Sequence, residues 1–107
     1  MPIIRIDFDN EQIGNDDIRN LSTGIRGIVS EVTEIEDVFV YANNSEIKVK
    51  VAPVEIFVEM SAHKIKDLGE LTTTIVSRLS DWKKENHFTT PLNLSVIPMP
   101  WKIEIGI

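Results

Sequence analysis

The chain has 107 residues, of which 42% are hydrophobic and none is cysteine, and its formal net charge at pH 7 is −6. This length and composition predict one domain with a single core, and they exclude a disulfide framework, a thiolate nucleophile and cysteine-bound zinc. No apolar run approaches the roughly 20 residues of a membrane helix, and no secretory signal follows Met1. The acidic net charge argues against nucleic-acid binding. We therefore expect a soluble, cytoplasmic protein that binds neither membranes nor nucleic acids.

The first part of the chain predicts a strand, a helix and a second strand. Apolar and polar residues alternate over residues 3–8, which is the period of a strand with one buried face. Residues 14–17, Gly-Asn-Asp-Asp, offer a side-chain helix cap and acids for the first helical turn. Apolar residues then recur at steps of three and four over residues 18–32, which predicts an amphipathic helix. Residues 38–41 predict a buried strand, and residues 43–45 predict the turn that follows it.

A proline divides the next extended segment. Residues 47–60 are rich in β-branched and apolar residues throughout. Pro53 lacks the backbone donor that a ladder needs, so we expect an edge piece at residues 47–51 and a core strand at residues 54–59.

The last part of the chain predicts a second helix and a strand, followed by a segment with exposed apolar side chains. The helix is expected to start within residues 61–64 and to carry an apolar stripe as far as Trp82, and a core strand is expected at residues 92–97. Prolines at residues 98–100 break the chain, after which four apolar residues alternate to its end: Trp101, Ile103, Ile105 and Ile107. An exposed apolar edge of this kind invites aggregation, so we expect it to pack against a neighbouring subunit.

The order of these elements predicts an α+β domain over residues 1–107. Two β-α-β units, 2–43 and 51–98, fit one four-stranded mixed sheet with both helices on one face, and residues 101–107 add a C-terminal interface strand. The ferredoxin-like and tautomerase folds share this outline, and the order of elements alone does not choose between them. The strand that begins at Pro2 and the surplus of extended chain favour the tautomerase fold.

Several short motifs carry a family resemblance. Met1-Pro2 followed directly by a strand, the tandem β-α-β layout, and Ser61 to Ile65 at the turn into the second helix together resemble the tautomerase superfamily, which includes macrophage migration inhibitory factor. The segments Met-Pro-Ile-Ile-Arg-Ile and Pro-Val-Glu-Ile-Phe-Val are similar to a bacterial branch, the domain of unknown function 1904 family. The resemblance implies a homotrimer with three sites at subunit boundaries, each containing one N-terminal proline, and a reaction that needs no metal or cofactor.

Proline at the N-terminus has chemistry that suits such a site. Once Met1 is removed, Pro2 carries a free secondary amine. An α-amine titrates near pH 8, and burial lowers its pKa by disfavouring the charged form. Near neutral pH this amine would move a proton between carbon and solvent as a general acid and base. The resemblance therefore implies keto–enol tautomerisation of a small carbonyl or enol compound, with Pro2 as the catalytic residue.

Other residues are candidates for binding the substrate. Long-chain members of the superfamily, such as macrophage migration inhibitory factor, have a tyrosine and an asparagine on the last strand, where this chain has Asn93 and Ser95. Those members have a lysine after the first helix, where this chain has Glu31-Val32-Thr33-Glu34, which would repel a substrate carboxylate. Arg5 is read either as an anchor for a substrate anion or as half of an ion pair with Glu55. The candidate binding set is Arg5, Ser61, Ala62, Asn93, Ser95 and Trp101.

Two other functions remain open at this point. One is a trimer of the same fold that acts without catalysis, as a binding or scaffold protein. The other is a ferredoxin-like sensor domain that binds a small ligand. A metal site is not expected, because His63 and His87 lie 24 residues apart on what we predict to be one helix, which would separate them by roughly 36 Å.

Overall fold

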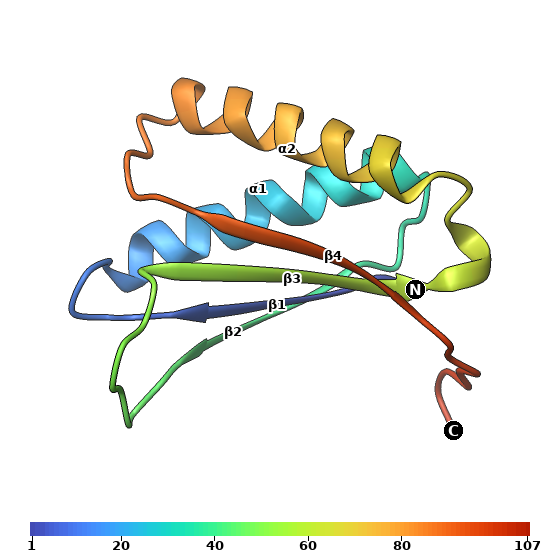
Figure 1. Ribbon diagram of the computed structural model, residues 1–107, viewed down its shortest axis with the longest axis horizontal. Helices are drawn as coiled ribbons and strands as arrows, with labels where there is room; N and C mark the ends of the chain where they lie inside the picture. The colour runs from blue at the N-terminus through green and yellow to red at the C-terminus, as the bar shows by residue number, and fades with distance from the viewer.

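The computed structural model describes all 107 residues and contains the predicted order of elements (Figure 1). The first unit is β1, α1 and β2, and the second is β3, a short 3₁₀ helix η1, α2 and β4. Their bounds are β1 Ile3–Phe8, α1 Asn15–Thr33, β2 Phe39–Asn44, β3 Val54–Ser61, η1 Ala62–Lys64, α2 Leu68–Glu85 and β4 Asn93–Met99. The fold class is therefore α+β, as predicted. Neither long helix has the length and apolar character that a membrane-crossing helix requires.

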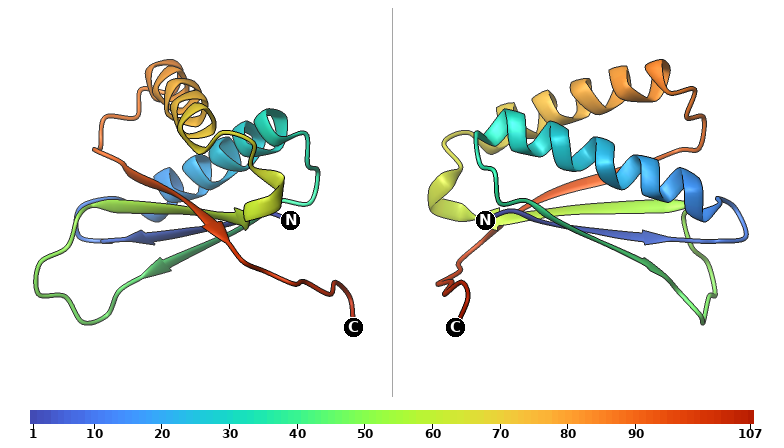
Figure 2. Two further views of the ribbon diagram at one scale, coloured as in Figure 1. Left: turned by 45° about the vertical axis from the view of Figure 1, so that its right-hand side comes forward. Right: turned by 180° about the vertical axis from the view of Figure 1, so that it is seen from behind.

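The four strands form one mixed sheet in the order β2-β1-β3-β4. The two strands of each unit are adjacent and parallel, and the central pair, β1 and β3, is antiparallel. Both helices cover the same face of the sheet, which leaves the other face open (Figure 2). In a ferredoxin-like fold each β-α-β unit is split by another strand. The topology therefore decides between the two folds and excludes the ferredoxin-like one.

The core lies between the sheet and the two helices. In β1 and β3 alternate side chains are buried, as the period of two predicts. Most of the predicted stripe on α1 faces this layer, with Ile18, Leu21, Ile25 and Ile28 buried. The central members from the sheet are Ile4, Ile6, Val54, Ile56 and Val58, all fully buried.

The prediction that residues 38–41 form a buried strand is wrong for two side chains. Val38 is buried just before the strand, but Phe39 and Tyr41 in β2 are 43% and 57% exposed. Both lie on the face of the sheet that carries no helix, because they are in register with Ile3 and Arg5 of β1. Two β-α-β units supply only one helical layer, so the second face of the sheet stays uncovered within one chain.

Element boundaries differ from the predictions at both helix starts and at one turn. The second helix begins at Leu68, because Asp67 caps it by accepting the Glu70 N–H at 3.0 Å, and the preceding residues turn as η1. The first helix follows Gly14, and no side chain caps it. β2 continues to Asn44, so the turn starts one or two residues later than expected.

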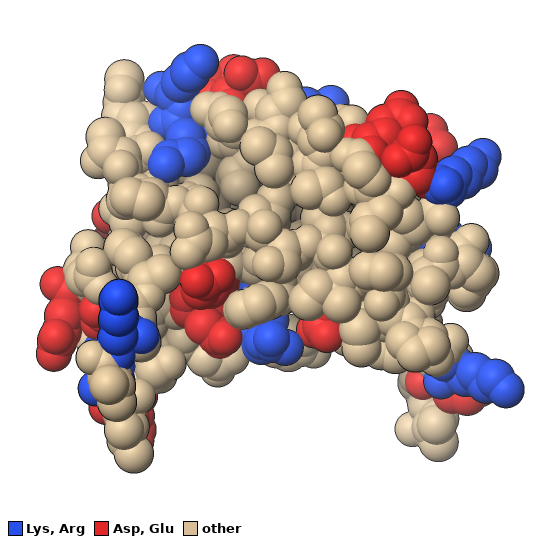
Figure 3. Space-filling model, in the orientation of Figure 1, with Lys and Arg blue, Asp and Glu red and all other residues tan.

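Two segments predicted to be strands are not strands within one chain. The edge piece at residues 47–51 belongs to the loop between β2 and β3, and residues 101–107 have no regular secondary structure. The loop and the C-terminal segment project beyond the sheet at opposite ends, away from the helices (Figures 1 and 3). Pro98 lies inside β4 without breaking it, because β4 is an edge strand and Pro98 has a pairing partner on one side only.

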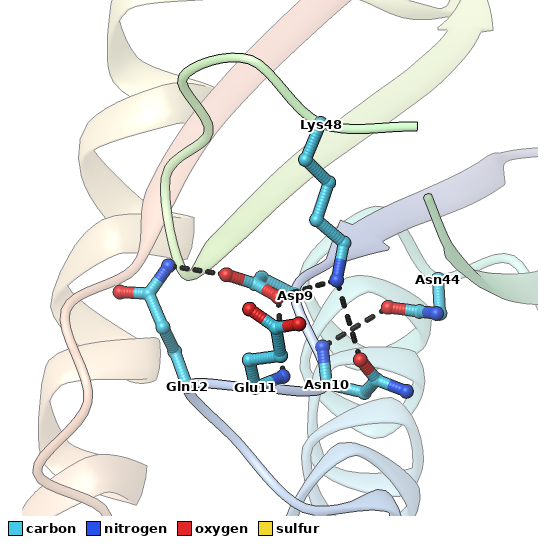
Figure 4. A network of polar contacts seen from close by, with 6 residues as sticks. All are labelled: Asp9, Asn10, Glu11, Gln12, Asn44 and Lys48. Carbon is cyan, nitrogen blue, oxygen red and sulfur yellow. Dashed lines mark hydrogen bonds and ion pairs between the residues drawn. The ribbon is translucent and has the colours of Figure 1, made fainter. Parts of the chain in front are cut away.

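A buried carboxylate anchors the loop between β2 and β3 (Figure 4). Asp9, just after β1, accepts hydrogen bonds from Lys48 Nζ at 2.6 Å, from Gln12 Nε2 at 2.6 Å and from the Glu11 N–H at 3.1 Å. The Asp9 N–H donates to the Pro53 carbonyl at 3.0 Å. These contacts lower the pKa of Asp9 from 3.8 to about 2, with the hydrogen bond from Lys48 as the largest cause.

The lowered pKa makes the contribution of Asp9 to stability depend on pH. A carboxyl whose folded pKa is below its unfolded value stabilises the fold above the unfolded value, and this contribution disappears as the pH falls through the folded value. We predict that Asp9→Asn is less stable than the wild type at pH 7, and that the difference shrinks as the pH falls from 3.8 toward about 2. Urea unfolding at a series of pH values, at one protein concentration, measures this. If the free energies of unfolding of the wild type and Asp9→Asn differed by the same amount at every pH, the lowered pKa of Asp9 would be contradicted.

The two helices approach each other closely at one glycine. A Cβ placed on Gly24 would lie 2.5 Å from the Trp82 ring, whereas a Cβ on Gly27 would have no neighbour within 4 Å. Trp82 also packs against Phe88, with ring centroids 5.5 Å apart. Gly24 therefore makes room for a helix–helix contact.

The two glycines form a matched pair for a stability test. We predict that Gly24→Ala lowers the free energy of unfolding by about 1–2 kcal/mol, because overpacking outweighs the gain in helix propensity. Gly27→Ala is expected to raise it by up to about 1 kcal/mol, because only the propensity changes. Urea unfolding with an unchanged m-value is the measurement. If both substitutions raised the free energy of unfolding, the Trp82 side chain would have to move aside without destabilising the fold.

Candidate functional site

Pro2 lies at the start of the central strand and is fully buried. Its carbonyl oxygen accepts the Phe39 N–H at 3.2 Å, which ties it to β2. On the other side, the antiparallel register pairs Ile3 with Glu59, so the chain before Ile3 runs alongside Met60 at the end of β3. Pro2 is therefore enclosed by both neighbouring strands at one end of the sheet.

The turn after β3 lies at the same end of the sheet. Ser61, the last residue of β3, is buried, and its hydroxyl does not cap η1. Ala62 follows in η1 and is exposed. Ser61 and Ala62 therefore lie at the end of the sheet where the chain enters β1 after Pro2.

A groove adjoins this end of the sheet. Its volume is about 430 Å³, and Met60 forms part of its wall together with apolar residues of both helices and the η1–α2 turn. Lys64 and Lys66 also line the groove, and neither makes an ion pair. The sequence analysis did not assign these lysines to the site, although they follow directly on the Ser61–Ala62 turn. The same lining also contains Arg78, Asp67 and Glu70, so the groove carries three basic and two acidic side chains.

The acids after the first helix have less influence than the sequence predicts. Glu31 forms an ion pair with Arg78 of α2, so its charge is compensated across the two helices. Glu34 ends α1 in the left-handed conformation, with φ 58°. The repulsion of a substrate carboxylate that we expected from these residues is therefore reduced by Arg78.

Arg5 lies on the open face of the sheet and is engaged there. Its guanidinium is 3.2 Å from the Glu59 carboxylate, 3.7 Å from the Asp7 carboxylate and 4.6 Å from the centre of the Phe57 ring. The ion pair that we considered for Arg5 exists, but its partner is Glu59. Glu55 instead accepts a hydrogen bond from Asn93 at 2.9 Å. Arg5 therefore holds neighbouring strands together on this face.

The candidate residues of the last strand lie away from Pro2 in the same chain. In the sheet register Asn93 pairs with Glu55 of β3, and Glu55 pairs with Asp7 of β1. Asp7 is five residues beyond Pro2, and five residues of strand span about 17 Å. Ser95 is two residues nearer, and Trp101 follows β4 beyond its end, half-buried. One chain therefore does not bring Asn93 and Ser95 together with Pro2, whereas Trp101 follows the end of β4 that pairs with Ser61, at the same end of the sheet as Pro2.

The structure contains no group of three or more histidine, cysteine or acidic side chains arranged to hold a metal ion. His63 lies in η1 and His87 follows α2, so they are not on one helix as predicted. Their positions at opposite ends of α2 keep them apart, as expected.

Comparison with known proteins identifies the fold. No family model and no curated protein matches the sequence. Among solved structures, a malonate semialdehyde decarboxylase, studied with a variant that has alanine in place of its first residue, a proline, matches with TM-score 0.65 and 11% identity over 98% of this chain and 92% of that one. A fused 4-OT asymmetric trimer matches with TM-score 0.64 and 10% identity over 91% and 85% of the two chains.

A third match bears on the bacterial branch named above. A domain of unknown function 1904 protein from Sebaldella termitidis has TM-score 0.62 and 19% identity, over 100% of this chain and 98% of that one. These similarities extend over nearly the whole chain and agree with the strand order and the single helical layer described here. The chain therefore has the fold of the tautomerase superfamily.

Proposed function

We propose that this protein is a homotrimeric, cofactor-independent keto–enol tautomerase in which Pro2 is the acid and base. The observation that supports this most is the placement of Pro2, which is buried just before the central strand β1, at the end of the sheet where Ser61 turns and where Met60 lines a groove. The shared fold with a decarboxylase for which an N-terminal proline variant was studied adds to this support.

The reaction needs only one titrating group of suitable strength. After removal of Met1, the Pro2 amine lies in a largely apolar setting, which favours its neutral form. In the ketonisation direction the Pro2 ammonium donates its proton to the enol carbon, the C=C π pair becomes the new C–H bond, and the enol hydroxyl loses its proton to solvent. The neutral Pro2 amine then takes a proton from solvent, which restores the ammonium, and the enol is produced by the same steps in reverse.

Residues of the same chain and of a neighbour would orient the substrate. Ser61 and Ala62 contribute the turn beside Pro2, and Lys64 at the groove attracts an anionic substrate group. Asn93 and Ser95 would come from an adjacent protomer, since one chain keeps them away from its own Pro2, whereas Trp101 follows β4 at the Pro2 end of the sheet. The role of Arg5 is to shape the open face and not to anchor the substrate, because Glu59, Asp7 and Phe57 already engage it.

Two features support the trimer. The open face of the sheet exposes aromatic side chains of β2, and the C-terminal segment leaves Ile105 and Ile107 exposed. Such surfaces are normally covered by a partner. A trimer of the same fold exists in the fused 4-OT structure.

One observation favours a second candidate, a trimer of the same fold that binds a ligand without catalysis. Pro2 is fully buried and is not among the residues that line the groove, so a ligand could occupy the groove without contacting the proline nitrogen. Retention of Met1 in the cell would leave the groove and the assembly intact but would remove the acid–base group.

The decisive experiment follows ketonisation of a small aromatic enol by protein that mass spectrometry shows to begin at Pro2. We predict that Pro2→Ala, which keeps an N-terminal amine but loses the ring and the secondary nitrogen, reduces kcat/KM by about 10²–10⁴-fold. The form that retains Met1 is the matched control, because its sequence is otherwise identical, and it is expected to be inactive. Equal rates for the protein that begins at Pro2 and for Pro2→Ala, or no activity in either, would rule out catalysis by Pro2.

A further inference from the structure

Met60, near the end of β3, is buried apart from the core. Its side chain is 2% exposed, yet Met60 does not belong to the cluster of 16 buried residues that forms the core. It lines instead the groove of about 430 Å³ described above. A buried side chain on the wall of a groove separates that groove from the residues behind it.

The residue behind Met60 is Pro2. The antiparallel register pairs Ile3 with Glu59, and its continuation by one position sets Pro2 opposite Met60. Opposite residues of an antiparallel pair share one face of the sheet, with Cβ atoms about 4.5–5.5 Å apart. The start of the chain, the end of β3 and η1 meet at one end of the molecule in two different views (Figures 1 and 2). Pro2 is fully buried and does not line the groove, so Met60 lies between the groove and Pro2.

The groove is suited to an apolar group. Its volume falls within the range of about 300–1,000 Å³ that is typical of small-molecule sites. Two of its charged lining residues are already engaged, since Arg78 pairs with Glu31 and Asp67 caps α2. Its apolar lining residues come from α1, β3, the η1–α2 turn and α2, and are Val32, Met60, Ile65 and Leu71. The space beyond Met60 would therefore accept an alkyl or aryl group.

A small substrate can approach Pro2 without entering the groove. Met1 is bonded to the Pro2 nitrogen and is half-buried, and it does not line the groove. Its removal, which the proposed mechanism requires, frees the space that it fills beside this nitrogen. A small substrate fits there without displacing Met60, whereas a substrate with a long apolar arm needs the groove as well.

We infer that Met60 is a specificity-determining residue of the proposed tautomerase, because its side chain closes the groove off from Pro2 and limits the substrate to small enols and carbonyl compounds without an extended apolar arm. The inference rests on the proposed function, since it concerns what reaches the Pro2 nitrogen. Methionine is unbranched and fills gaps of irregular shape, so a shorter side chain at this position joins the two spaces. Lys64 is exposed on the turn, and its charge acts on an approaching anion whether the groove is open or closed.

Chemical labelling of the Pro2 amine measures access to it independently of catalysis. In protein that mass spectrometry shows to begin at Pro2, the neutral amine attacks the carbon of an isothiocyanate and forms a C–N bond. The amine proton passes through solvent to the isothiocyanate nitrogen, which gives a thiourea with no leaving group. Ethyl isothiocyanate is the short reagent, and phenylhexyl isothiocyanate is the reagent with a long apolar arm. Mass spectrometry quantifies the labelled N-terminal peptide, and each rate is divided by that of a free peptide beginning Pro-Ile-Ile.

We predict that Met60→Ala raises the ratio of long-reagent to short-reagent labelling rates by roughly tenfold or more over the wild type, because the arm gains the groove. Met60→Leu, which keeps a side chain of similar volume, is the matched control and is expected to keep the wild-type ratio. Circular dichroism checks that each variant is folded, and Met60→Val replaces Met60→Ala, with the same expectation, if the latter is not. Equal normalised rates of both reagents in the wild type, an unchanged ratio in the shortened variant, or an equal rise in Met60→Leu would overturn the inference.

A block placed in the groove tests the path of the arm. Thr74 lines the groove, so Thr74→Trp added to the shortened Met60 variant is predicted to return the labelling ratio to the wild-type value. Thr73→Trp is the matched control, because Thr73 is exposed and does not line the groove, and it is expected to leave the raised ratio unchanged. Equal effects of the two tryptophans, or no effect of either, would show that the arm reaches Pro2 by another path and would overturn the inference.

The outcomes separate this inference from the proposed function, because the labelling ratio reports access to Pro2 and not turnover. The predicted ratios in a protein without enol activity would support Met60 as the residue that controls access and would count against the tautomerase alone. Unchanged ratios in a protein whose enol activity is lost in Pro2→Ala would overturn the role of Met60 and leave the proposed function standing.

Discussion

The antiparallel pairing of β1 with β3 is the interaction on which the rest of this structure depends. It joins two β-α-β units into one sheet, and its register sets Ile3 opposite Glu59 and Asp7 opposite Glu55. Even-numbered side chains of both strands then face the helices and form the core. Because Pro2 precedes the first of these pairs, the same register places it beside the end of β3. A slip by one residue would turn the core side chains outward and separate the site.

The register also explains where the charges lie. Asp7 and Glu55 face each other across the two strands, an arrangement of like charges that weakens a sheet. Arg5 lies 3.7 Å from Asp7, and Asn93 donates a hydrogen bond to Glu55. The polar groups of the open face are therefore occupied by cross-strand contacts. Away from the open face, the groove beside Met60 holds Lys64 and Lys66, which make no ion pair, together with Asp67 and Glu70.

The proposed trimer and the proposed activity both depend on surfaces that a single chain leaves uncovered. One helical layer covers one face of the sheet, both edge strands have free backbone, and the loop between β2 and β3 and the C-terminal segment project into solvent. Under the proposed function, Asn93 and Ser95 reach a Pro2 only in a neighbouring protomer. The proposed activity therefore depends on the proposed trimer.

The sequence by itself determined the order of the elements, the fold class, the stripe of α1 and the alternation in β1, because local periodicity records which side of an element is buried. It also placed Pro2 at the start of the first strand. Only the tertiary structure decided that each unit's strands are adjacent, that Arg5 pairs with Glu59 and not Glu55, and that Lys48 turns inward to Asp9. These contacts join residues 36 or more positions apart, and their partners depend on strand order and register, which no local pattern contains.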